Sequence, residues 1–160
     1  MKYFLVIIFL LMSNLLVAQD SVQNDFFLAE TYFRQGEYKK ATQIYKKLYN
    51  KSEFNNTFLN RLISCYQQTD DFKTVESLLQ KRIKKNASHT YLFVFLGYNY
   101  QRQQQQELAN TNYQKAINSL NKNTTYGGLI GRLFKEYNLL DNAIFAYEKA
   151  MQGNPNANYN

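Results

Sequence analysis

The sequence has 160 residues but one cysteine, Cys65, one histidine, His89, and one proline, Pro155, and it has no tryptophan. A single cysteine excludes an internal disulfide and a cysteine-based metal cluster. With one histidine, placed in a predicted link between helix pairs, no Ser-His-Asp or Cys-His catalytic arrangement can be drawn. Because proline interrupts helices, its near absence is typical of a chain that is almost wholly helical.

Long apolar runs are also absent, apart from the one within residues 1–18, MKYFLVIIFLLMSNLLVA. This run is shorter than the roughly 20 residues that span a bilayer. Lys2 precedes it and polar residues follow Ala18, which is typical of a secretory signal peptide cut near Ala18. No cysteine lies nearby, so bacterial lipoprotein processing is excluded. The sequence therefore predicts an exported protein whose mature chain has no membrane span.

Acidic residues are the scarcer charge, with 12 Asp and Glu against 19 Lys and Arg, for a net charge of +7. Such a balance favours acidic partners in principle. The basic run at 81–85 is nevertheless predicted to be a solvated helix face, and nucleic acid is not an expected partner of an exported chain. Gly127-Gly128 lacks the Lys-Ser or Lys-Thr of a phosphate-binding loop. We predict no catalytic residues, no metal and no cofactor.

What the sequence does contain is a pattern that recurs every 34 residues without insertion. Four copies in register indicate stacked helical hairpins, with units at about 22–55, 56–89, 90–123 and 124–157. The landmarks of the first copy are Leu28, Ala29, Tyr32, Gly36, Tyr38, Ala41, Tyr45 and Leu48. The fourth copy carries Ile130, Gly131, Phe134, Asn138, Leu140, Ala143, Tyr147 and Ala150, followed by Pro155.

At these positions the chain resembles the tetratricopeptide repeat (TPR) family. The second copy departs most from the family pattern, since Ile63 and Val75 stand where small residues belong and Arg82 replaces the usual Ala. The resemblance implies an all-α fold, a right-handed α-solenoid of four 34-residue helix-turn-helix repeats within residues 19–160. It is a fold signal and carries little information on function.

Small residues at matched positions predict a close approach of the two helices in three of the units. In the second unit, Ile63 facing Val75 predicts a wider separation. Cys65, next to the packed Tyr66, is predicted to be a small buried hydrophobe. The small-residue pairs are Ala29 with Ala41, Gly97 with Ala109, and Gly131 with Ala143.

In stacked hairpins the first helix of each unit lines a concave side, which makes its outward residues the candidate peptide-binding groove. Phenylalanine and tyrosine rings there would seat apolar side chains, and the basic residues would hold a carboxylate. The alternative is that these residues are solvated or shielded by the next unit. Phe26 and Glu30 stand where chaperone co-factors of this family carry Lys and Asn, which argues against that binding mode. The candidates are Phe26, Glu30, Phe33, Arg34, Asn60, Ser64, Gln67, Tyr91, Val94, Tyr98, Gln101, Arg102, Arg132 and Lys135.

The predicted last helix, 141–152, carries more apolar residues than one face can bury, among them Ile144, Phe145, Tyr147 and Met151. Either the array continues in a longer protein, or another molecule covers this surface, which leaves self-association through 141–152 open.

These features favour a non-catalytic scaffold that binds a protein or peptide in its groove. The signal peptide, with a composition rich in Asn, Lys, Tyr and Ile, favours the periplasm or envelope of a bacterium. The alternative function is an exported sensory or regulatory module of a longer signalling protein. A third is an enzyme whose catalytic domain lies outside this sequence.

Overall fold

A computed structural model describes residues 21–53 and 55–154, and the regular structure among them is helical. The chain divides into two compact units, Met1–Asp70 and Asp71–Asn160. The predicted signal peptide and Pro155 lie outside the described residues. The boundary between the two compact units falls at the turn inside the second repeat, the copy that departs most from the family pattern. The wide spacing predicted for Ile63 and Val75 stays a prediction, because the two residues belong to different units.

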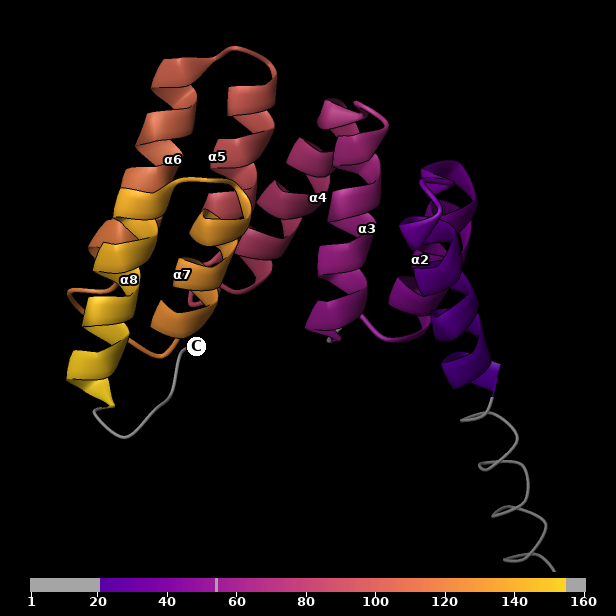
Figure 1. The fold of residues 1–160 in the computed structure, drawn as a ribbon, viewed down its shortest axis with the longest axis horizontal. Helices are drawn as coiled ribbons and strands as arrows, with labels where there is room; N and C mark the ends of the chain where they lie inside the picture. Colours follow the sequence, from indigo (N-terminus) through magenta and orange to yellow (C-terminus); the bar gives the residue numbers. More distant parts are fainter. Residues whose placement is uncertain (1–20, 54, 155–160) are drawn as a thin grey trace, which may run out of the picture. The chain divides into compact units, whose positions relative to one another are not determined.

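The described part of the first unit consists of a helix over residues 21–34, α2 (Tyr38–Lys51) and α3 (Asn56–Gln68) (Figure 1). Ala29 of the first helix and Ala41 of α2 are both fully buried, which agrees with their predicted close approach. Tyr45 and Leu48 continue the buried face of α2 at helical spacing. Helices α2 and α3 pack against each other, so this apolar face forms the centre of the unit.

The second unit contains α4 (Phe72–Lys85), α5 (Leu92–Arg102), α6 (Gln106–Ser119), α7 (Gly127–Glu136) and α8 (Leu140–Gly153). Helices α5 and α6 form one hairpin, and α7 and α8 form the next (Figure 1). The first helices of the hairpins, α5 and α7, contact each other, as do the second helices, α6 and α8, while α4 packs on α5. Successive hairpins of this unit therefore stack in register, first helix beside first helix.

The hairpin turns repeat one backbone conformation. At each turn one residue has a positive φ, and these residues are 34 positions apart: Gly36 (75°), Asp70 (57°), Gln104 (60°) and Asn138 (59°). At three of them the next N–H bonds back to a carbonyl five residues earlier, Glu37 to Tyr32, Gln105 to Tyr100 and Leu139 to Phe134. This pattern is a Schellman helix end, which glycine adopts without strain and other residues do not.

Two glycines make room for a tyrosine ring. A Cβ atom at Gly97 would lie 2.4 Å from the ring of Tyr113 and 3.1 Å from the carbonyl oxygen of Ala109. A Cβ atom at Gly131 would lie 2.7 Å from the ring of Tyr147. The short distance to Ala109 agrees with the predicted close approach of Gly97 and Ala109. At both glycines the nearest atoms belong to the aromatic side chain one turn further along the partner helix, which the prediction did not name.

Candidate binding surface

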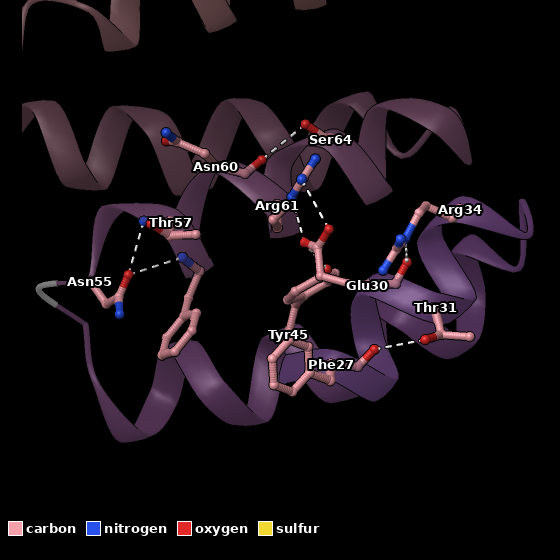
Figure 2. A network of polar contacts seen from close by, with 11 residues as sticks. Phe27, Glu30, Thr31, Arg34, Tyr45, Asn55, Thr57, Asn60, Arg61 and Ser64 are labelled. Carbon is pink, nitrogen blue, oxygen red and sulfur yellow. Dashed lines mark hydrogen bonds and ion pairs between the residues drawn. The ribbon is translucent and has the colours of Figure 1, made fainter. Parts of the chain in front are cut away.

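The carboxylate of Glu30, on the first helix, is held by side chains from both other helices of its unit (Figure 2). The Tyr45 hydroxyl donates a hydrogen bond of 2.6 Å to Oε1. Arg61 of α3 makes a two-point ion pair, with Nε 2.6 Å from Oε1 and Nη2 3.0 Å from Oε2. Burial and the bond to this carboxylate raise the pKa of Tyr45. Glu30 is therefore engaged within its own unit by the geometry that makes arginine–carboxylate pairs strong.

The two phenylalanines predicted for the groove of the first unit also contact their own unit. The ring centre of Phe26 lies 6.2 Å from that of Tyr45 in an edge-to-face arrangement. The ring of Phe33 lies 5.3 Å from Tyr38, and the Arg61 guanidinium sits 5.0 Å from the Phe33 ring centre. Aromatic and cation–π contacts of this kind stabilise the unit itself.

The remaining predicted residues of the first unit differ in exposure. Arg34 is exposed, and its Nε donates to the Glu30 carbonyl at 3.3 Å. The Ser64 hydroxyl donates to the Asn60 carbonyl at 3.0 Å, so it is engaged on its own helix (Figure 2). Gln67 is only 2% exposed, which corrects its assignment as a groove residue, because a side chain without solvent access cannot meet a partner.

Tyr91 and Val94 are corrected in the same way, since both are 0% exposed. Tyr91 precedes α5, and its ring centre lies 5.2 Å from that of Tyr126 and 6.4 Å from that of Phe95. The physical reason is that α5 has neighbours on three sides, α4, α6 and α7. The adjacent helices therefore cover these two positions, although both face away from the hairpin partner.

Tyr98 of α5 is half-buried and stacks on Tyr137, which follows α7. Their ring centres are 3.7 Å apart and the ring planes differ by 2°. Three residues further along α5, the Gln101 side-chain oxygen accepts a hydrogen bond of 2.6 Å from the Tyr113 hydroxyl of α6. Burial raises the pKa of both Tyr113 and Tyr137. These two residues therefore remain protonated and hold the α5 side chains in place.

The basic candidates of the second unit are exposed. The Arg102 guanidinium lies 5.6 Å from the Phe72 ring centre. Arg132 and Lys135, both on α7, are exposed, and neither has an ion-pair or hydrogen-bond partner within residues 21–53 and 55–154. The second unit thus presents two cationic side chains that its own described residues do not neutralise.

Four of these residues share one surface. Tyr98 and Arg132 occupy the same repeat position on α5 and α7, and Gln101 and Lys135 occupy another. Because α5 and α7 are adjacent, equivalent positions lie on the same side of this layer. We call the surface made by Tyr98, Gln101, Arg132 and Lys135 the α5–α7 face.

The sequence prediction missed Arg61 and Tyr137, although each is a principal contact of a predicted residue. Arg61 pairs with Glu30 across 31 residues. The opposite charges were a usable signal, since they lie on first helices of adjacent repeats. Tyr137 stands beside the turn residue Asn138, and nothing in the pattern marks it as the stacking partner of Tyr98.

Metal ligation and cysteine reactivity can both be assessed in the described residues. They contain no group of three or more His, Cys, Asp or Glu side chains placed to bind a metal ion. Cys65 is fully buried, as predicted, and burial raises the pKa of its thiol to about 11, so the thiolate is scarce at neutral pH. No helix within 21–53 and 55–154 has the length and apolar character needed to cross a membrane.

Comparison with known proteins supports the fold and goes no further. Neither a family model nor a curated protein matches the chain. Two crystal structures of MamA match 82% of this chain at 22% identity and a TM-score of 0.51, covering 77% and 72% of their own chains. MamA residues 41 to the end from Desulfovibrio magneticus RS-1 match 82% of this chain at 15% identity, with 74% of that chain covered and a TM-score of 0.51. The all-helical, TPR-like fold class predicted from the repeat is confirmed.

Proposed function

We propose that this chain is a non-catalytic scaffold of the bacterial periplasm or cell envelope that binds a segment of another protein on the α5–α7 face. The observation that carries the proposal is the pair Arg132 and Lys135, exposed and without a partner in the described residues, beside the stacked ring of Tyr98. TPR-like hairpins commonly present such surfaces to protein partners. The likeness to MamA supports the fold on which this function rests.

The chemistry of the face indicates what the bound segment contains. Arginine offers a planar fork that matches a carboxylate, and lysine adds a point charge. The Tyr98–Tyr137 stack is a fixed aromatic surface, against which an apolar or aromatic side chain can pack. A segment with Asp or Glu next to an apolar residue meets both requirements. The expected partner is therefore a protein, and no nucleic acid or cofactor is part of the proposal.

Export is part of the proposal, and the signal-peptide pattern of residues 1–18 supports it.

The two exposed basic side chains of α7, Arg132 and Lys135, contribute little to the stability of the fold. Since they do not serve an ion pair within the described residues, a role in recognition explains their placement on one face.

The test is a capture experiment from envelope extract with three baits. The double variant Arg132→Glu/Lys135→Glu should lose the acidic partner by at least tenfold, because two favourable charges become repulsive. The matched control is Lys73→Glu/Lys81→Glu, which makes the same charge change at two exposed positions of α4. Circular dichroism confirms that all three baits are folded. If the three capture the same proteins in equal amounts, the α5–α7 face is not the binding surface.

A further inference from the structure

Large apolar side chains are exposed mainly at the two end helices of the described chain. Of the six exposed large hydrophobic residues, only Leu108 (47%), on α6, lies elsewhere among the described residues. Exposed apolar patches of this kind mark interaction surfaces. The other five are Phe27 (55%) and Leu28 (46%) on helix 21–34, and Leu140 (55%), Ile144 (56%) and Met151 (46%) on α8.

The second unit shows how such side chains are buried where one repeat meets the next. Tyr113 of α6, at the end of the third repeat, packs edge-on against Phe134 of α7, at the start of the fourth, with ring centres 5.5 Å apart. Ile117 of α6 is 9% exposed and Ile130 of α7 is 0% exposed. The two rings thus meet at the joint between successive repeats, and the aliphatic residue one turn from each ring is buried as well.

The end helices carry the same residue classes at the same repeat positions. On α8, Tyr147 and Met151 correspond to Tyr113 and Ile117, one repeat earlier. On helix 21–34, Leu28 and Tyr32 correspond to Ile130 and Phe134, three repeats later. Exposure is what differs, since Leu28 is 46% exposed where Ile130 is 0%, and Met151 is 46% exposed where Ile117 is 9%. Helix α8 thus carries the residues that α6 contributes to the joint, which we call the outgoing half. Helix 21–34 carries the residues that α7 contributes, which we call the incoming half.

We infer that a second copy of this chain covers Leu28 and Met151, with α8 of one copy docking on helix 21–34 of the next as successive repeats dock within the second unit. The contact is head-to-tail, so each copy keeps one free end and can add another. A symmetric contact of α8 with α8 would leave Phe27 and Leu28 exposed. The inference is independent of the α5–α7 face and of the function proposed for it.

Two substitutions at exposed positions test the contact by complementation in the full chain. Leu28→Lys breaks the incoming half and Met151→Lys breaks the outgoing half, and at 46% exposure neither should disturb folding. In sedimentation velocity, the wild-type mass should rise with concentration beyond a dimer. Each variant alone should need at least tenfold more protein to associate. An equimolar mixture should form a dimer and nothing larger, because one intact joint remains between unlike variants.

The matched control is Leu108→Lys, which replaces an equally exposed apolar residue away from the end helices and should associate as wild type does. Several outcomes overturn the inference. A wild-type chain that stays monomeric at every concentration shows that no second copy covers these faces. A Leu28→Lys chain that dimerises as wild type does, while Met151→Lys is monomeric, shows a symmetric α8 contact. Association unchanged in both variants places the contact elsewhere, residues 1–18 included.

Discussion

Glu30 in the first unit and Arg132 in the second stand at the same position of the repeat, three repeats apart, and their surroundings are opposite. Glu30 is held by Tyr45 and by both donor positions of Arg61, so its charge is neutralised inside the unit. Arg132 is exposed and has no partner within 21–53 and 55–154. The comparison teaches that one repeat position can serve folding in one copy and remain available for binding in another.

The apolar cores of the two units differ at another shared position. Phe134 in the second unit is 0% exposed and packs against Tyr113 of the preceding repeat. Its equivalent in the first unit, Tyr32, is half-buried, with the Lys40 ammonium 5.2 Å from its ring centre. The same aromatic landmark is thus a core residue in one unit and a partly solvated one in the other.

The largest expected difference between the units comes from deleting this aromatic ring. Phe134→Ala should lower the free energy of unfolding of the second unit by about 3–5 kcal/mol, because it removes transfer energy and leaves a cavity. Tyr32→Ala should cost the first unit about 1–2 kcal/mol, since its ring is already partly in water. Urea unfolding followed by circular dichroism measures both. Equal losses would show that the two positions are equally buried in solution.

A smaller effect is expected from the polar cluster of the first unit. Glu30→Ala should destabilise by about 1–2 kcal/mol, because it leaves the Tyr45 hydroxyl and the Arg61 guanidinium without their acceptor. A double-mutant cycle with Arg61→Ala isolates the pair, whose coupling should fall as salt rises. Arg132→Ala, the equivalent change in the second unit, should stay within about 0.5 kcal/mol of wild type. A comparable loss at Arg132 would mean that it has a structural partner.

The smallest effect on stability is expected at the hairpin turns. Gly36 in the first hairpin and Gln104 in the third have the same left-handed backbone conformation. Gln104→Gly should stabilise the chain by about 0.5–1 kcal/mol, since glycine relieves a left-handed conformation that glutamine adopts at a cost. Gly36→Ala should destabilise by about 1 kcal/mol, although nothing lies within 4 Å of the added Cβ, because the φ of 75° alone opposes it. Thermal unfolding of the two variants checks the signs. Opposite signs to these would show that the turns are not equivalent in solution.

The repeat predicted the fold because its landmark residues mark the buried faces of helices and the turns between them. The turns fall where Gly36 and its equivalents place them, and Ala29, Ala41 and Cys65 are buried as expected. The candidate surface was less predictable. Assigning Tyr91 and Val94 to a groove required knowing which sides of α5 the neighbouring helices leave open, and they leave neither residue exposed.

The periodic positions by themselves determined that residues 21–53 and 55–154 fold into helices, that the hairpins recur every 34 residues and where each hairpin turns. These features depend on helix periodicity and on residues close in sequence, so a single chain displays them. Only the tertiary structure decided that Arg61 neutralises Glu30, that Tyr137 stacks on Tyr98, and that the side chains of Arg132 and Lys135 are exposed. Such contacts join side chains from different helices, whose meeting depends on how the helices pack and leaves no periodic mark in the sequence.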